Sequence, residues 1–270
     1  MSASTTPIAF SGNIPVNYDH YLGPLFFEPF ALAISERVCN QTSLKVLELA
    51  SGTGRLTKHL EQQLDSTSTI YASDINPAMV AFGKAKTKAS KVSWMEIDAV
   101  SLPFPDEQFD CVVVQFGVMF YSDKLQAFRE AYRVLKPGGR FIFSCWDHIS
   151  NNKAANITNE ALKKFFPVNT PAFYSVPFSY FDLQQVMADL AVSGFNQRSA
   201  ETLKLEGFAH SAEDAATGLI RGTPTVTAIE ELNANAIGGF MAYLIQQLTE
   251  TFGAKELRVP IQAHVVTAVK

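Results

Sequence analysis

The chain has 270 residues, of which 47% are hydrophobic and 18% are charged, and its formal net charge is -4. This composition is that of a globular protein and excludes a disordered one. The charge leaves no basic excess to bind polyanions, so we expect no nucleic-acid partner. No apolar run reaches the roughly 18 residues of a membrane span, and no secretory signal is evident at the N-terminus. Cys39, Cys111 and Cys145 form no CxxC pair, so a reducing, cytoplasmic location is expected.

The first segment, residues 1–43, ends in an aromatic-rich stretch at residues 18–30. We predict that this stretch forms a helical lid across the rim of a binding site. Tyr18 and Tyr21 are expected to close over a bound acceptor, and His20 between them is a candidate base.

Strand-like and helix-like segments alternate in residues 44–147, which predicts a parallel sheet covered on both faces. The expected strands are 44–49, 69–72, 92–97, 109–115 and 140–145, the expected helices are 54–64, 77–86 and 123–134, and 136–139 is expected to be a turn. Asn76 and Pro77 are suited to begin the second helix.

Residues 148–270 follow without a linker, so we expect them to complete the same sheet and to carry helical insertions over it. The expected helices are 149–166, 181–190, 211–218 and 228–252, and the expected strands are 196–205 and 261–269.

A glycine-rich turn follows the first strand and opens the first core helix. It contains Gly52 and Gly54, and Glu48 lies at the strand end before them. Such a turn places backbone N–H groups against a nucleotide-like ligand. The dinucleotide pattern requires a third glycine, which is absent here. Glu48 would repel a pyrophosphate and suits a cation instead, although a nicotinamide oxidoreductase stays an alternative.

Five motifs in register resemble those of the class I S-adenosylmethionine-dependent methyltransferases. They are the acidic-x-G-x-G-x-G run at Glu48–Gly54 with Ala50 at its first glycine position, Asp74 about 20 residues further on, Asp98-Ala99, the L-P-F-P-D-E-Q-F-D run at 102–110, and the R-V-L-K-P-G-G run at 133–139. The nearest group is the small-molecule type that includes ubiquinone and menaquinone biosynthesis enzymes.

The resemblance implies a Rossmann-like, doubly wound α/β fold with seven strands in a mixed sheet, the last one antiparallel, and helical cap insertions. It implies S-adenosyl-L-methionine as cofactor, bound by residues 44–147. Asp74 would hold the ribose diol and Asp98 the adenine amino group. The alternatives are that Asp74 is a helix cap and that Asp98 is a turn residue. The expected cofactor residues are Glu48, Ala50, Ser51, Gly52, Gly54, Asp74, Ile75, Met79, Asp98, Ala99, Gln115 and Phe116.

The implied reaction is an in-line methyl transfer to a small, apolar or aromatic acceptor. The candidate acceptor residues are Tyr18, Tyr21, Met119, Tyr121, His210 and Arg221, and the candidate bases are His20 and His148. Proximity alone is an alternative to a base. No His/Cys cluster suggests a metal site. A non-catalytic binding or scaffold protein remains the second alternative, and both a monomer and a homodimer are open.

Overall fold

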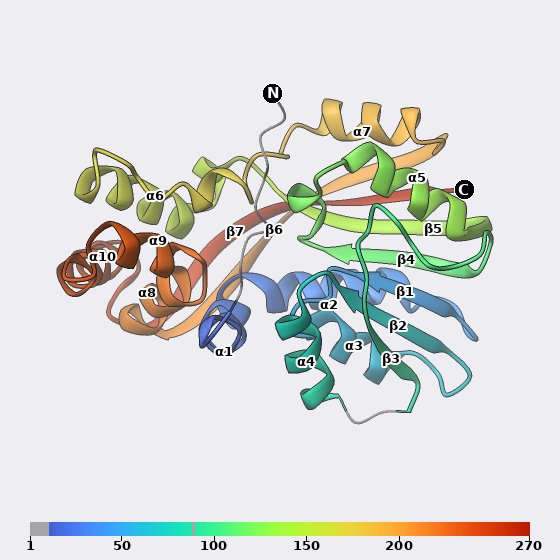
Figure 1. The fold of residues 1–270 in the computed structure, drawn as a ribbon, viewed down its shortest axis with the longest axis horizontal. Coiled ribbons are helices and arrows are strands. Elements are labelled where there is room, and N and C mark those ends of the chain that lie inside the picture. The colour runs from blue at the N-terminus through green and yellow to red at the C-terminus, as the bar shows by residue number, and fades with distance from the viewer. Residues whose placement is uncertain (1–10, 88–89) are drawn as a thin grey trace.

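A computed structural model describes residues 11–87 and 90–270, so the first ten residues of the predicted lid lie outside it. Seven strands form one sheet in the order β3-β2-β1-β4-β5-β7-β6 (Figure 1). The strands are β1 Lys45–Leu49, β2 Thr69–Asp74, β3 Val92–Glu96, β4 Phe109–Gln115, β5 Leu135–Trp146, β6 Gln197–Ser211 and β7 Lys255–Val269. The first five pair in parallel, and β7 runs antiparallel to both β5 and β6. The predicted Rossmann-like mixed sheet with an antiparallel last strand is confirmed.

Helices cover both faces of this sheet. Those on or beside the predicted core are α1 Ile14–Asn17, η1 Tyr18–Phe27, α2 Glu28–Val38, α3 Arg55–Gln63, α4 Pro77–Lys86, η2 Val118–Phe120, α5 Lys124–Val134 and α7 Leu183–Val192. Phe30 of α2 packs edge-on against Trp146, whereas Phe128 of α5 packs against Phe143, so α2 and α5 lie on opposite faces of β5. Asn76 caps α4 as predicted, because its side chain accepts the N–H of Ala78 at 2.9 Å.

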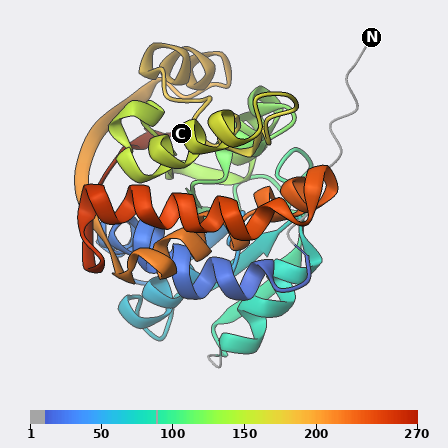
Figure 2. The same cartoon turned by 90° about the vertical axis from the view of Figure 1, so that its left-hand side faces the viewer.

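The remaining helices gather beyond the long strands β6 and β7 (Figure 1). They are η3 Ile149–Asn151, α6 Lys153–Phe165, η4 Phe173–Ser175, α8 Ala212–Arg221, α9 Thr225–Asn233 and α10 Ala236–Phe252. Figure 2 looks onto this end of the molecule, where α10 (orange-red) runs across it. Within the described part of the chain, no helix is both long and apolar enough to cross a membrane.

The turn predicted at residues 136–139 is wrong, because these residues belong to β5. They are held in the strand by the end of the chain. The N–H of Gly138 donates to the carbonyl of Lys270 at 2.9 Å, and the N–H of Lys270 donates to the carbonyl of Gly139 at 3.0 Å. The single helix expected over 228–252 is divided into α9 and α10, and β7 begins before its predicted start.

The described N-terminal segment is helical, as predicted, and η1 is a π-helix with Pro24 inside it. This helix packs closely on β6. A Cβ added at Gly207 of β6 would overlap the carbonyl group of Leu25. Only glycine therefore allows the backbones of η1 and β6 to approach so closely.

We predict that Gly207→Ala lowers the free energy of unfolding by about 1–3 kcal/mol, because the added methyl overlaps backbone atoms that cannot rotate away. Urea denaturation would measure this loss. The matched control is Gly238→Ala in α10, where nothing lies within 4 Å of the added Cβ. That change should instead stabilise the protein, by about 0.5–1 kcal/mol. Equal effects of the two substitutions would contradict the close packing of η1 on β6.

Candidate functional site

The glycine turn between β1 and α3 is built from residues in the left-handed region. The φ angles are 51° at Ala50, 54° at Gly52 and 81° at Gly54. Gly54 is the N-cap of α3, and its helix has no side-chain cap. The Thr57 N–H of this first turn donates to the Glu48 carboxyl group. The N–H groups before it can serve a ligand, which is the usual basis of ligand binding at a helix N-terminus.

Ala50 stands where the motif has its first glycine, and its positive φ angle is costly for a residue with a Cβ. The structure shows how its methyl group is accommodated. A Cβ added at Gly117, just after β4, would lie 2.5 Å from the Cβ of Ala50. Gly117 thus provides the space that Ala50 occupies.

Glu48 lies at the end of β1 and is only 1% exposed. Its Oε2 accepts a hydrogen bond from the Thr57 hydroxyl of α3 at 2.6 Å. Burial raises the pKa of Glu48 to about 8, and the negative charge of Asp74 adds to this shift. A cation beside the buried carboxyl group of Glu48 would therefore stabilise its ionised form.

Asp74 at the end of β2 joins the turn to the neighbouring strand. Its Oδ2 accepts the N–H of Gly52 at 2.9 Å, and its Oδ1 accepts the N–H of Asn76 at 2.8 Å. Burial raises the pKa of Asp74, while these hydrogen bonds oppose part of that shift. Ser51 also bonds to β2, because its N–H donates to the Ser73 carbonyl at 2.8 Å. Two buried carboxyl groups therefore flank the turn.

The other residues expected around the nucleoside differ in exposure. Asp98, after β3, is exposed, and its Oδ1 accepts the N–H of Val100 at 3.1 Å. Ile75 is 56% exposed, whereas Met79 and Ala99 are buried.

The end of β4 meets the N-terminal segment. The Gln115 side chain donates to the carbonyl of Phe27 at 2.7 Å. The ring of Phe116 stacks on Trp146 with 3.8 Å between centroids, and Phe30 lies edge-on to it at 5.2 Å. Sequence reasoning placed Phe116 here without its stacking partner Trp146, which the apolar end of the fifth strand could have suggested. Met119, in η2, is buried.

Arg55 holds the N-terminal segment against the glycine turn. Its guanidinium donates to Glu28 Oε2 at 2.5 Å and to the Asp19 carboxylate at 3.3 Å. Lys86 of α4 also pairs with Asp19 at 2.7 Å, and His59 pairs with Glu28 at 2.8 Å. From sequence, Arg55 was only a bulky residue after the last glycine, because its acidic partners are distant in the chain.

Tyr18 of η1 approaches the site from the N-terminal segment. Burial raises the pKa of its hydroxyl, and the charge of Asp74 raises it further. The charge of Asp74 thus acts on a residue in the described part of the predicted lid.

Three other predicted residues, His20, Tyr21 and His210, line one hollow of about 290 Å³. Its remaining lining residues are Asp19, Pro24, Arg55, Phe208, Ala209 and Asp214. Arg55 follows the glycine turn directly, and none of the lining residues belongs to the expected cofactor set. Arg221 is not among them; it is exposed, and its carbonyl accepts the Asn17 side chain at 3.3 Å.

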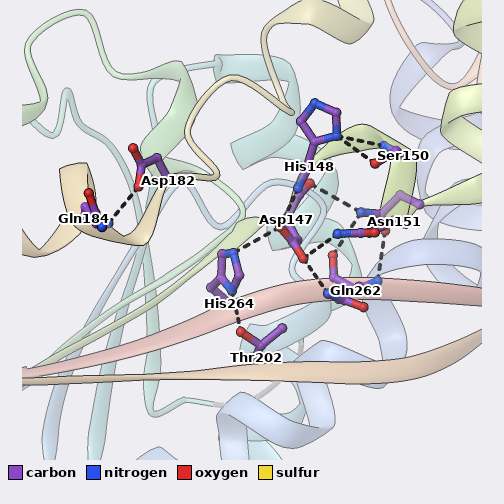
Figure 3. A network of polar contacts seen from close by, with 10 residues as sticks. Asp147, His148, Ser150, Asn151, Asp182, Gln184, Thr202, Gln262 and His264 are labelled. Carbon is purple, nitrogen blue, oxygen red and sulfur yellow. Dashed lines mark hydrogen bonds and ion pairs between the residues drawn. The ribbon is translucent and has the colours of Figure 1, made fainter.

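His148 lies at the surface after β5. Its Nδ1 is 2.8 Å from the Ser150 hydroxyl, and its ring lies edge-on to Phe181 with 4.8 Å between centroids. Its own N–H donates to the neighbouring Asp147 at 2.6 Å. Figure 3 shows the imidazole of His148 pointing away from the Asp147 carboxylate.

Asp147 is the centre of a polar network that sequence reasoning did not find (Figure 3). His264 Nε2 of β7 lies 3.3 Å from its Oδ1, and the Nδ1 of that ring is 2.9 Å from the Thr202 hydroxyl of β6. Gln262 and Asn151 also donate to its carboxylate. Burial alone would raise the pKa of Asp147, but these donors and the charge of His264 hold it below its usual value. The network fastens the end of β5 to β7 and β6.

Among residues 11–87 and 90–270, no group of three or more His, Cys, Asp and Glu side chains is placed to hold a metal ion.

Comparison with known proteins agrees with the predicted resemblance. The model of the ubiE/COQ5 methyltransferase family matches residues 28–181. The ubiquinone/menaquinone biosynthesis C-methyltransferase UbiE of Enterobacter sp. (strain 638) is 41% identical over 101 residues, which are 36% of this chain and 40% of that protein. The protein of the same name from Proteus mirabilis (strain HI4320) is 39% identical over 102 residues, 36% of this chain and 41% of that one. The similarity thus spans about two fifths of these relatives.

Solved structures share the fold at low sequence identity. Phosphoethanolamine N-methyltransferase 2 of Haemonchus contortus, in complex with S-adenosyl-L-methionine, gives a TM-score of 0.58 at 19% identity, over 95% of this chain and 56% of that one. The YcgJ protein of Bacillus subtilis gives a TM-score of 0.57 at 18% identity, over 90% of this chain and 98% of that one. The [4+2]-cyclase SpnF gives a TM-score of 0.53 at 18% identity, over 90% of this chain and 81% of that one.

The family match extends from α2 through the glycine turn to the end of β5 and beyond, over more than half of the chain. It includes both buried carboxyl groups and the strand order that brings them together. On this evidence the chain belongs to the ubiE/COQ5 methyltransferase family, within the class I S-adenosylmethionine-dependent methyltransferases that its motifs resemble.

Proposed function

We propose that this protein transfers a methyl group from S-adenosyl-L-methionine to a small aromatic acceptor of the hydroquinone type. Family membership supports methyl transfer. The acceptor class is suggested by the curated relatives, whose names give ubiquinone and menaquinone biosynthesis. The family model matches residues 28–181, which include the glycine turn and both buried carboxyl groups.

One observation carries the proposal: two buried carboxyl groups, Glu48 and Asp74, flank a turn of left-handed residues. We assign Glu48 to the positive charge of the cofactor, Asp74 to its ribose hydroxyls and Asp98 to its adenine amino group. The N–H groups at the start of α3 would donate hydrogen bonds to its carboxylate. When bound, S-adenosyl-L-methionine supplies a methyl group on a positively charged sulfur, which is already a good leaving group. The residues of the turn fit such a cationic nucleoside.

The protein's own contribution would be orientation and exclusion of water. Correct alignment of two reactants can lower a barrier by about 7–11 kcal/mol. The ion pairs of Arg55 with Asp19 of η1 and Glu28 of α2 hold the N-terminal segment against the turn, as a lid that keeps water out would require. A base is needed only if the acceptor must lose a proton during attack. His20 and His148 stay predictions for that role, and the acceptor contacts of Tyr18, Tyr21, Met119, His210 and Arg221 stay predictions as well.

Methyl transfer from labelled cofactor to a panel of hydroquinones and catechols tests the proposal. We expect a methylated product, and we expect Asp74→Asn to raise the KM for the cofactor by about tenfold or more, because hydrogen bonds to a charged group are lost. The thermal midpoint serves as control for folding. An unchanged KM would remove Asp74 from the ribose role. Tight binding of S-adenosylhomocysteine without product from any acceptor would support a scaffold instead.

The raised pKa of Glu48 predicts how the stability of the free protein depends on pH. Below its usual pKa of about 4.3, both the folded and the unfolded state hold the proton. As the pH rises toward 8, the folded state keeps the proton while the unfolded state releases it, so the free energy of unfolding falls. Glu48→Gln cannot titrate. Its stability relative to the wild type should therefore increase between pH 5 and pH 8 in urea denaturation.

Glu130→Gln is the matched control, because the hydrogen bonds from Arg133 lower the pKa of Glu130 despite its partial burial. Glu130 contributes stability above its usual pKa and loses it as the pH falls below that value. The free energy of unfolding of Glu130→Gln should therefore be lower than that of the wild type by the same amount from pH 5 to pH 8. A constant difference for Glu48→Gln as well would contradict the buried, protonated state assigned to Glu48.

A further inference from the structure

Tyr121 follows η2, at the end of β4, and its side chain is turned into the protein. Its hydroxyl is buried and makes no hydrogen bond to any residue that the structure describes. Within residues 11–87 and 90–270, Trp94 Nε1 is the one other buried side-chain nitrogen or oxygen in this condition. The ring of Trp94 lies against Gly54 of the glycine turn.

A buried hydroxyl without a partner destabilises the folded state, because it gives up its hydrogen bonds to water. A phenylalanine at this position would fill the same space without that cost. The hydroxyl is therefore not explained by packing alone. The related buried residue Tyr174 shows the ordinary arrangement, since its hydroxyl donates to the Leu219 carbonyl at 2.8 Å.

Tyr121 follows β4, which runs parallel to β1, β2 and β3, so it is placed at the same edge of the sheet as Asp74 and Asp98. Burial raises the pKa of the hydroxyl, and the negative charges of Asp74 and Asp98 raise it further. Both carboxylates therefore act on the hydroxyl, although they belong to the ends of β2 and β3. Asp74 accepts N–H groups from Gly52 and Asn76, and Asp98 accepts one from Val100. None of these bonds uses Tyr121.

The two carboxylates are acceptors, so they suit only the donors of a ligand, such as hydroxyl and amino groups. A nucleoside also carries acceptors, namely its ring nitrogens and its ribose oxygens. A phenolic hydroxyl can donate to such an atom. Tyr121 can thus donate a hydrogen bond to an acceptor atom of the nucleoside, which the carboxylates of Asp74 and Asp98 cannot do.

We propose that the Tyr121 hydroxyl is a ligand of the nucleoside part of the cofactor and donates to one of its acceptor atoms. This inference rests on the proposed function. It moves Tyr121 from the acceptor side of the reaction, where the sequence placed it, to the cofactor side.

Tyr121→Phe tests the proposal by calorimetric titration with S-adenosylhomocysteine and with 5′-methylthioadenosine, which has the nucleoside but no amino acid end. We expect Kd to rise about 3- to 10-fold for both ligands, as the loss of one hydrogen bond implies. The thermal midpoint of the ligand-free variant should equal or exceed that of the wild type. The substitution therefore weakens binding without weakening the fold.

Tyr174→Phe is the matched control, because it removes a buried hydroxyl that is already paired. It should lower the thermal midpoint and leave both Kd values unchanged. Equal Kd values for wild type and Tyr121→Phe would overturn the inference. A loss with S-adenosylhomocysteine alone would also overturn it, because the hydroxyl would then contact the amino acid end. If the wild type bound neither ligand, the proposed function itself would fail.

Discussion

The hydrogen bond from the Gly52 N–H to the Asp74 carboxylate is the interaction on which the rest of the site depends. It joins the turn after β1 to the end of β2, at 2.9 Å. Ala50, Gly52 and Gly54 of the turn have positive φ angles, a conformation that local sequence alone holds weakly. A buried carboxyl group that accepts N–H groups from Gly52 and Asn76 fixes this conformation and the position of its own oxygens together. The same atoms thus shape the turn and present an acceptor beside it.

The surrounding contacts hold the N-terminal segment on this turn. Arg55 comes directly after the last glycine and pairs with Asp19 and Glu28. On the other side, Phe30 of α2 packs edge-on against Phe116 and Trp146, and the backbone of η1 lies against Gly207, so both contacts fasten the same segment to the sheet. Burial then raises the pKa of Glu48 and of Asp74. A cation or a hydrogen-bond donor bound beside either carboxyl group would therefore favour its ionised form.

The cofactor half of the molecule was largely predictable from sequence, because its signals are local. A glycine pair after a buried strand, a carboxylate at each strand end and Asn76 before Pro77 each act within a few residues. Contacts between distant segments were not predictable. Residues 136–139 have the composition of a turn, yet they pair with Lys270 and extend β5. Ala50 departs from the motif, and only the fold shows that Gly117 gives its methyl group room. The network of Asp147, His264 and Thr202 likewise joins three strands that are far apart in the chain.

The most direct test is a crystal structure of the protein with S-adenosylhomocysteine. The account predicts that the ribose hydroxyls lie within hydrogen-bond distance of the Asp74 carboxylate while the bond from the Gly52 N–H is kept. Density for the ligand away from the turn, or an Asp74 side chain turned away from the ribose, would contradict it.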